Sequence, residues 1–382
     1  MNSICLNMIV KNEAHVVRRC LMALKDHIDY WVIVDTGSDD GTQKIVQECL
    51  RGCPGELPER GWVNFEHNRN EALELARCKA VYTLFVDADE IIHFLPSFDK
   101  KKLQKNFYFL KTIAKGQEFY FPKLIKNDPH WRWAGVLHES VYHPGEVEGD
   151  TCTSIWTESI QDGARSRDPA KNQRDIDILK AAIEKDPSDA RYVFYLAQTY
   201  FTAYRFEEAL KVYEVRAKMQ GAEDETFWSL FAIAQIEEYL GRPSERYLSS
   251  YEKAYAFDPG RAEPLERMAN YYLQNGRSLL AYALMKHAAK LPVPFPLSSG
   301  YYGWVYHFAI DSILADAALD LGRKKEAKEI YEKILRKEKI PSGLVNHVRE
   351  ELSKIDACER FPESARAIQF SKLPIHLSFV SG

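Results

Sequence analysis

Apolar and polar positions follow two different rhythms along the chain, and the first covers roughly the first 160 residues. Short continuous apolar runs, typical of strands buried on both faces, alternate there with segments of helical spacing. Strands and helices that alternate in this way predict a largely parallel sheet covered by helices. The expected strands are 4–10, 30–34, 62–65 and 82–86, and the expected helices are 14–24, 42–50 and 70–80.

The second rhythm begins near Asn172, where the strand pattern ends and long amphipathic helices take over. Four segments share a small alanine, a turn and a second helical stretch, and their alignment places Ala197, Ala234, Ala269 and Ala315 in register. The intervals are 37, 35 and 46 residues, the last one stretched by a proline-rich insertion at 291–300. Such spacing favours tetratricopeptide-like repeats of about 34 residues over an ordinary helical bundle. Stacks of this kind usually bind peptides or partner proteins on a concave surface.

Polar clusters directly follow three of the expected strands. They are Lys11-Asn12-Glu13, Asp35-Thr36-Gly37-Ser38 and Asp87-Ala88-Asp89. Ligands of parallel sheets bind at the carboxyl ends of the strands, so we expect these clusters to meet at one edge. The third cluster continues into Glu90, and carboxylates are too costly to bury there for packing alone. They indicate either the start of a helix or a divalent-cation site formed by Asp87 and Asp89.

Composition narrows the classes of function. The 382 residues suggest about two to three domains, and a net charge of −4 gives no electrostatic footprint for nucleic acid. No apolar run approaches the roughly 20 residues that span a bilayer, and the start lacks the features of a secretory signal. Seven cysteines without paired spacing suit reduced thiols in a cytoplasmic protein, with Cys5, Cys20 and Cys78 expected in the core. Metalloprotease, hydrolase and P-loop motifs do not occur in the sequence.

Four motifs resemble those of family 2 glycosyltransferases with the GT-A fold. In chain order they are MIVKNEAHVVRRCL, WVIVDTGSDDGT, HNRNEAL and LFVDADE. Three later segments, RWAGVLHES, DGARSRDPAKNQRD and DARYVFYLAQTYF, resemble members of this family fused to tetratricopeptide repeats. The resemblance implies an α/β, Rossmann-like GT-A domain over residues 1–165 and all-α helical repeats over 172–355. A tail at 356–382 is expected either to pack back onto the chain or to mark a truncated protein.

The same resemblance implies inverting transfer of a sugar from a nucleotide-sugar donor, expected to be a UDP-sugar, to a protein, peptide or glycan acceptor. A Mn²⁺ or Mg²⁺ ion can neutralise the donor's diphosphate. By the family's pattern, Asp87 and Asp89 would bind the metal, with Asp87 also reaching the donor, and Val10, Glu13 and Asp35 would contact the nucleotide. Asp35 has a structural alternative as a cap or turn residue. The competing class is a non-catalytic scaffold that binds proteins through its repeats, but the intact carboxylate motif argues against a degenerate transferase domain.

Two arginines are further candidates for the donor site. Arg69 can pair with phosphate or with carboxylates of the protein itself. Arg165, in the segment that joins the two halves of the chain, can face phosphate or, together with Asp162, form salt bridges between domains. Asp39 and Asp40 fit a turn or a helix cap better than a ligand site.

Besides the polar clusters at the strand ends, which are the first chemical focus, the segment WRWAGVLHES at residues 131–140 is a second group of candidate site residues, the second chemical focus. Tryptophans stack well on the apolar faces of sugars, and inverting transfer needs a base that takes the acceptor's proton. The family commonly places an acidic base here in an E-D type motif, where this chain has His138-Glu139. We therefore expect Glu139 to be the catalytic base and His138 to assist as a ligand of the metal or of phosphate. A polar helix cap beside a buried tryptophan is the structural alternative for this pair.

Overall fold

The structure is a computed structural model that describes residues 2–294 and 300–360. These residues form two compact units, the first made of residues 2–241 and 300–301 and the second of residues 242–294 and 302–360. The tail expected to pack back or end abruptly lies outside the described residues from 361 onward.

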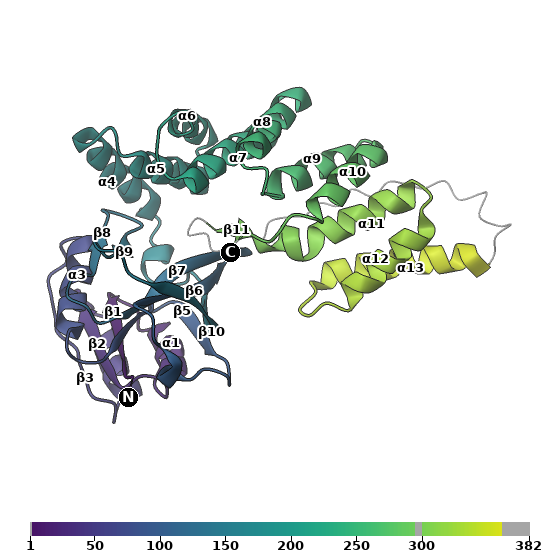
Figure 1. Cartoon of the computed structure of the whole chain (residues 1–382). Helices are drawn as coiled ribbons and strands as arrows, with labels where there is room; N and C mark the ends of the chain where they lie inside the picture. Colours follow the sequence, from purple (N-terminus) through teal and green to yellow (C-terminus); the bar gives the residue numbers. More distant parts are fainter. Residues whose placement is uncertain (1, 295–299, 361–382) are drawn as a thin grey trace. The chain divides into compact units, whose positions relative to one another are not determined.

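A mixed sheet is the centre of the first unit (Figure 1). The strands along its main path are β1 (Ile4–Val10), β2 (Tyr30–Asp35), β3 (Gly55–Glu56), β4 (Tyr82–Phe85), β5 (Glu90–Phe94), β6 (Phe107–Ala114), β7 (Gln117–Lys126) and β10 (Gly149–Ser159). The two-residue strand β11 (Tyr301–Tyr302) pairs with β7 off this path. The spatial order is β3-β2-β1-β4-β7-β6-β10-β5. The first four strands of this order run parallel, whereas β7 is antiparallel to both β4 and β6 and β5 is antiparallel to β10. The half of the sheet that the polar clusters follow is therefore wholly parallel, whereas the other half is mixed, with β6 and β10 as its one parallel pair.

Helices cover both faces of this parallel half because successive strand residues point to opposite sides. On one face, Ile4 and Leu6 of β1 belong to a core cluster that includes α1 (Val17–Leu24) and α2 (Thr42–Cys49). On the other face, Cys5 packs with Ala72 and Ala76 of α3 (Phe65–Ala76).

Two expectations for this region were wrong. The short strand expected at 62–65 is a loop that leads into α3, because the Asn64 side chain accepts a hydrogen bond from the His67 N–H and so caps the helix. Cys78, expected in the core, is exposed and adopts a φ of +63° just after α3, whereas Cys5 and Cys20 are buried.

A small separate hairpin carries the second chemical focus. It consists of β8 (Arg132–Ala134) and β9 (Ser140–Tyr142), which pair antiparallel to each other outside the main sheet. Trp131 and Val141 are buried against Leu73 of α3 and Phe85 of β4. The hairpin is thus fixed on the α3 face of the sheet, and its connecting loop contains His138 and Glu139.

Helices follow in both units. The first unit contains α4 (Lys171–Lys185), α5 (Ala190–Thr202), α6 (Phe206–Arg216) and α7 (Glu223–Tyr239). The second contains α8 (Ser244–Phe257), α9 (Glu263–Gln274), α10 (Ser278–Ala288), a π-helix (Val305–Ala309), α11 (Ile310–Asp320), α12 (Lys324–Leu335) and α13 (Ser342–Arg360). The four register alanines have no exposed surface, as expected for residues at tight helix crossings: Ala197, Ala234, Ala269 and Ala315. The described part of 172–355 is helical apart from turns and the two-residue strand β11 (Tyr301–Tyr302).

The repeat also appears in the backbone of the turns between successive helices. One residue in each turn adopts left-handed φ: Tyr204 at +58°, Gly241 at +64°, Gly276 at +69° and Gly322 at +75°. In three of the turns, the N–H of the following arginine donates to a carbonyl five residues back, as in a Schellman motif. Glycine adopts this conformation without strain, whereas a residue with a Cβ pays about 1–2 kcal/mol. Tyr204 is therefore the strained member of an otherwise glycine-based series.

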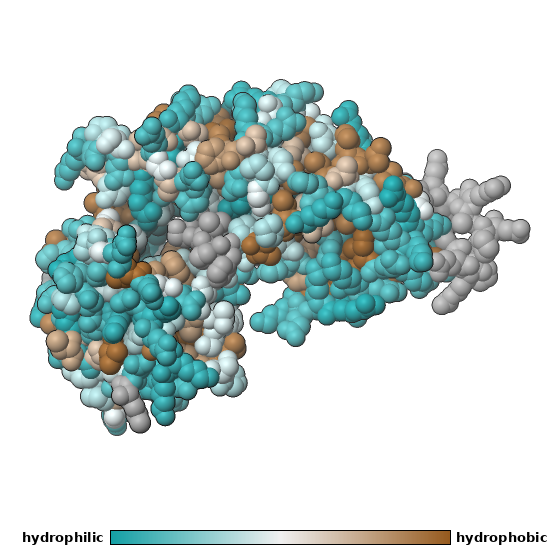
Figure 2. All heavy atoms as spheres, in the orientation of Figure 1, coloured by the Kyte–Doolittle hydropathy of each residue, from teal (hydrophilic) through white to brown (hydrophobic). Residues whose placement is uncertain are grey.

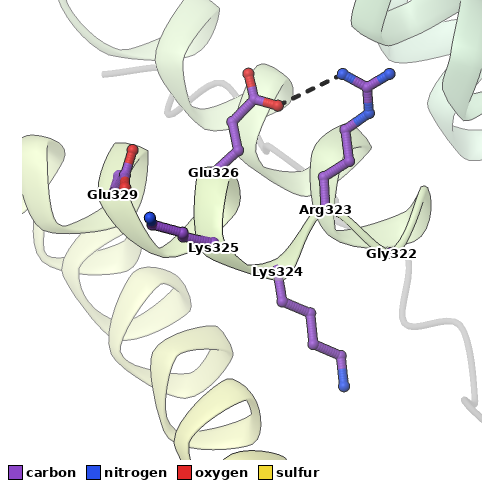
Figure 3. A pocket seen from close by; sticks show the side chains of 6 residues that line it. All are labelled: Gly322, Arg323, Lys324, Lys325, Glu326 and Glu329. Atoms are coloured by element: carbon purple, nitrogen blue, oxygen red, sulfur yellow. Dashed lines mark ion pairs between the residues drawn. The ribbon is translucent and has the colours of Figure 1, made fainter.

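Within the described ranges, no helix combines the length and the apolar character needed to cross a membrane. The face drawn in Figure 2 is mostly hydrophilic, with hydrophobic atoms in small scattered groups. An open hollow of about 670 Å³ lies at the start of α12 in the second unit (Figure 3), and it contains none of the residues expected to form a site. Its lining is Gly322, Arg323, Lys324, Lys325, Glu326 and Glu329.

Candidate active site

The carboxyl ends of β1, β2 and β4 meet at one edge of the sheet, as the sequence pattern predicts. Val10, the last residue of β1, is in register with Asp35, the last residue of β2, and β4 lies parallel on the other side of β1. The Val10 side chain is buried, and its carbonyl accepts hydrogen bonds from the N–H and the hydroxyl of Thr36 at 2.9 and 3.0 Å. The β1 and β2 ends are therefore locked together.

Asp35 is fully buried at this edge. Its Oδ1 accepts the N–H groups of Gly37 and Ser38, both at 2.8 Å, which is the turn role considered from the sequence. Its Oδ2 is also buried but has no hydrogen-bond partner among the described residues. A buried carboxylate oxygen without a donor is costly, so the turn role explains only half of this side chain, and Oδ2 suits an N–H or O–H donor from a ligand.

Arg69 of α3 joins the two chemical foci. Its Nη2 donates to Asp87 Oδ1 at 2.9 Å, and its Nε forms an ion pair with Glu139 Oε1. The guanidinium lies 4.9 Å above the Trp133 ring, and the Arg69 side chain is only 13% exposed. The ion-pair interpretation of Arg69 thus describes its contacts in this structure.

The carboxylates beside Asp87 are electrostatically crowded. Burial, together with the charges of Asp87 and Glu90, raises the pKa of Asp89. Burial raises the pKa of Glu13 to about 7, where Asp89 adds to the effect and a hydrogen bond from the Ala164 N–H opposes it. Such shifts mark a surplus of negative charge, and a divalent cation would relieve it.

Asp87 differs because cations reach it. Partial burial works to raise its pKa, but Arg69 and Lys123 outweigh this effect and lower it, and about half of the side chain remains exposed. Asp87 is therefore ionised and open at neutral pH.

Glu90, whose structural role the sequence did not reveal, and Lys123, which sequence reasoning missed, hold the Asp87 loop in place. Glu90 is buried and accepts the Asp87 N–H at 3.0 Å through Oε2, while its Oε1 forms an ion pair with Lys123 of β7. The signal that could have revealed this pair is the lysine inside the otherwise apolar stretch FYFPKLI.

The segment after β10 closes over the carboxylates. The Ala164 N–H donates to both Glu13 oxygens at 3.2 Å, and the Gly163 N–H lies 3.4 Å from Asp89 Oδ2. A Cβ on Gly163 would come within 3.1 Å of that oxygen, so a larger residue here would push the Asp89 carboxylate away by a few tenths of an ångström. Asp162 anchors the segment through two hydrogen bonds from Arg19, at 2.7 and 2.9 Å.

Arg165 points its charge toward the helices. Its Nη2 pairs with Asp175 of α4, and its guanidinium lies 4.5 Å above the Phe65 ring. Of the two roles considered for Arg165, contact with phosphate or a salt bridge, the structure shows the salt bridge. Asp162 instead pairs with Arg19 of α1, within the sheet domain.

His138 lies on α5 and away from the carboxylate pair. Its ring stacks on Tyr195 at 4.1 Å, and its backbone adopts a φ of +53°. Desolvation by the surrounding protein, followed by the charges of Lys171 and Arg165, lowers the pKa of His138 to about 4, although the residue as a whole is exposed. The imidazole is therefore neutral at pH 7. The ligand atoms of Asp87, Asp89 and His138 do not form a group within 4.8 Å of one another in the described structure.

Of the turn and cap roles considered for Asp40, the structure shows a turn residue in the loop before α2, whose N-cap is Gly41. Its Oδ2 accepts the Ala14 N–H at 2.9 Å, and its Oδ1 accepts the Thr42 N–H at 3.0 Å. The Thr42 hydroxyl in turn accepts the Glu13 N–H at 2.9 Å. This chain of bonds fixes the loop that presents Glu13.

Residues 5–108 match the family model of glycosyl transferase family 2. The chain therefore carries a family 2 glycosyltransferase domain at its N-terminus, and a tetratricopeptide-like helical region follows it. A curated relative, a TPR repeat-containing protein of Synechococcus elongatus, is 36% identical over 151 residues, which are 37% of this chain and 36% of that protein. The chain thus spans about a third of the length of this relative.

Solved structures of repeat proteins are also similar to this chain. A tetratricopeptide repeat protein from Parabacteroides merdae is 16% identical, with a TM-score of 0.36 over 52% of this chain and 71% of that one. A TPR protein from Thermus thermophilus is 21% identical, with a TM-score of 0.33 over 48% of this chain and 92% of that one.

Proposed function

We propose that this protein is a metal-dependent, inverting glycosyltransferase that moves a sugar from a nucleotide-sugar donor, first of all a UDP-sugar, to a protein, peptide or glycan acceptor. The observation that supports the proposal is the sheet edge: β2 and β4 flank β1 in parallel, Asp35 ends β2, and Asp87 and Asp89 follow β4, all within the residues matched by the family model. A scaffold without catalytic function would have no use for so many costly carboxylates at one edge.

The donor nucleotide binds across the ends of β1 and β2 in this proposal. Asp35 Oδ2 supplies an acceptor for an N–H or O–H of the base or ribose, and Val10 and Glu13 line the same edge. Asp87 and Asp89 hold Mn²⁺ or Mg²⁺, which suits the surplus negative charge around them. The bound ion would neutralise the donor's diphosphate.

Glu139 accepts the proton of the acceptor group as that group attacks the sugar. Arg69 already binds Oε1 of Glu139, which leaves Oε2 to take the proton. Arg69 also binds Asp87, so it sets the position of the base relative to the donor side. Neutral His138 beside Glu139 can donate a hydrogen bond to phosphate or to the acceptor, and Arg165, whose charge acts on His138, can attract phosphate.

The helical region presents the acceptor. The support for this step is that α5 contacts the hairpin loop: Arg191 donates to the His138 carbonyl at 3.0 Å, and the Tyr192 hydroxyl lies 3.4 Å from the Val136 N–H. A protein held by the repeats would therefore lie next to the proposed base.

The donor site is tested by thermal unfolding with nucleotides. UDP should raise the melting temperature in Mn²⁺ and much less in EDTA, and Asp89→Asn should lose this difference while folding normally. Asp39→Asn is the matched control, because Asp39 is an exposed carboxylate in the neighbouring loop. An equal shift in EDTA, or no shift with any nucleotide, would contradict the metal-bridged donor. Hydrolysis of a panel of nucleotide sugars then identifies the donor, and its complete absence would favour the scaffold.

A further inference from the structure

Asp128, His130 and His143 form a cluster of metal-ligating side chains that the proposed reaction does not use. Their ligand atoms all lie within 4.8 Å of one another, and in the described ranges no other group of three or more such residues does so. Asp128 and His130 come directly before β8, and His143 comes directly after β9. The cluster therefore lies where the two ends of the hairpin meet.

The distances are close to those of a zinc site. Zn²⁺ takes imidazole nitrogen at about 2.0–2.1 Å and carboxylate oxygen at about 2.0–2.2 Å, so tetrahedral ligand atoms lie about 3.3 Å apart. Asp128 Oδ1 is 2.7 Å from His130 Nδ1 and 3.4 Å from His143 Nε2. The remaining separation, between the two imidazoles, needs to close by at most about 1.5 Å to reach that spacing. Rotation of the His130 side chain can supply this movement because it is 66% exposed.

His143 is prepared for both states of such a site. Its Nδ1 lies 3.0 Å from the Gly145 N–H nitrogen and 3.1 Å from the Gly145 carbonyl oxygen. Without metal, Nε2–H can donate to Asp128 while Nδ1 accepts from the Gly145 N–H. With metal, Nδ1–H can donate to the Gly145 carbonyl while the Nε2 lone pair faces the ion. A backbone carbonyl behind the distal nitrogen is the usual support of a metal-binding histidine.

Packing keeps the His143 ring in this orientation. The ring contacts the buried Trp131 edge-on, with a centroid distance of 5.1 Å, and the side chain is 11% exposed. The His130 backbone N–H also binds Asp128 Oδ1, at 2.8 Å. Two of the three ligands are thus positioned before any ion arrives, and this lowers the entropic cost of binding.

We propose that Asp128, His130 and His143 bind a divalent transition-metal ion such as Zn²⁺ and so tie together the two ends of the β8–β9 hairpin. Two imidazoles and one carboxylate suit Zn²⁺ and its neighbours, whereas Mg²⁺ and Mn²⁺ prefer oxygen ligands like those at the sheet edge. The ion stiffens the hairpin whose loop presents Glu139. This binding site does not depend on the proposed transfer reaction.

The first test measures metal binding by the full chain. Metal-free protein in a non-chelating reductant is titrated with Zn²⁺ in a calorimeter, and with Co²⁺ in a spectrophotometer. Wild type should bind one equivalent at this cluster, and His130→Ala should bind it more than about 100-fold more weakly, beyond the 10–100-fold typical of losing an outer partner. His67→Ala, the loss of another exposed histidine, should bind normally.

Free cysteines are the main competing ligands, and Cys78 is exposed. Co²⁺ bound to imidazole and carboxylate lacks the intense thiolate charge-transfer absorption, so the spectrum separates the two sources. A thiolate spectrum, or equal affinity in wild type and His130→Ala, would overturn the site.

The second test asks whether the ion stiffens the hairpin. Amide hydrogen exchange of residues 131–142 should slow at least about threefold when Zn²⁺ is added to wild type, since local opening must then break metal–ligand bonds. His130→Ala should show no such change. Stoichiometric Zn²⁺ binding with unchanged amide exchange in wild type would reject the proposal that the ion ties the two ends of the hairpin together. The UDP response in Mn²⁺ would be unaffected, so this failure is distinct from a failure of the proposed function.

Discussion

Buried charge is treated in opposite ways at the sheet edge and in the helices. Arg216 of α6 has no exposed surface, and it donates to Glu225 at 3.2 Å and to the Thr226 hydroxyl at 3.0 Å. Arg261, before α9, is bound by Glu263 at 2.7 and 3.1 Å. At the sheet edge, by contrast, Glu13 and Asp89 have raised pKa values because burial and like charges outweigh their hydrogen bonds. Balanced charge is a feature of a scaffold, whereas surplus charge requires a ligand to complete it.

The largest effect in this comparison of the sheet edge with the helices is expected for sugar transfer when Glu139 is changed. Glu139→Gln keeps a hydrogen-bond acceptor for Arg69 but cannot accept a proton at neutral pH. Sugar transfer should therefore fall by about 10²–10⁴, the usual share of a general base. UDP affinity should stay within a few-fold because Asp87 and Asp89 are unchanged. Single-turnover transfer and calorimetry with UDP separate the two quantities.

Glu66→Gln is the matched control for this measurement. Glu66 accepts the Gly135 N–H at 3.0 Å, so it touches the same loop from an exposed position. Near wild-type transfer by Glu139→Gln would place the base elsewhere, and loss of UDP binding would assign Glu139 to the donor site.

In the helices, the matching experiment removes one charge of a buried ion pair and measures stability in place of transfer. Arg216→Met leaves Glu225 buried with Arg191, at 3.0 Å, as its remaining partner. Breaking a buried pair costs about 3–5 kcal/mol of unfolding free energy, and the remaining partner favours the lower end. Arg18→Met breaks an exposed pair with Glu48 and should change the free energy of unfolding far less, because solvent screens that pair. Urea unfolding monitored by circular dichroism measures both, and equal stabilities would remove the contrast between buried and exposed pairs.

The parallel half of the fold could be predicted because its signal is local. A strand buried on both faces needs a continuous apolar run, and the run at residues 4–10 has the same limits as β1. Strands β6 and β7 were not assigned, because they pair antiparallel and mix lysines and aromatic residues into their apolar positions. The place of β7 beside β4, and of β6 beside β10, depends on contacts between residues far apart in the sequence.

The site divides in the same way. Strand ends can be read from a short window, so the meeting of Asp35 with Val10 could be expected. The double pairing of Arg69 could not, because Glu139 lies 70 residues away on a separate hairpin. Nor could the stacking of His138 on Tyr195, which requires α5 to pack on the loop.

A smaller effect is expected from overfilling a helix crossing. Ala234→Leu adds three carbon atoms at a position of α7 without exposed surface, which should cost about 1–3 kcal/mol of unfolding free energy. Ala181→Leu on the exposed face of α4 is the matched control and should change stability little, since both residues favour helices. A neutral Ala234→Leu would contradict the assignment of this alanine to a tight crossing.

The smallest effect concerns a partly buried balanced pair in the second unit. His347 Nε2 lies 2.8 Å from Asp316 Oδ1, and this hydrogen bond is the main reason why the pKa of His347 is raised in the folded protein. A raised folded pKa stabilises the protein fully below the unfolded value of about 6.5, and the contribution disappears as pH rises through the folded value. The difference in unfolding free energy between wild type and His347→Gln should therefore decline with pH above about 6.5, at about 1.4 kcal/mol for each unit of pKa separation. Other titrating groups, Glu13 among them, are common to both proteins and cancel in this difference. A difference that does not change between pH 5 and 9 would mean that Asp316 does not stabilise the protonated form of His347. A difference that grows with pH would mean that the pKa of His347 is lowered, not raised, in the folded protein.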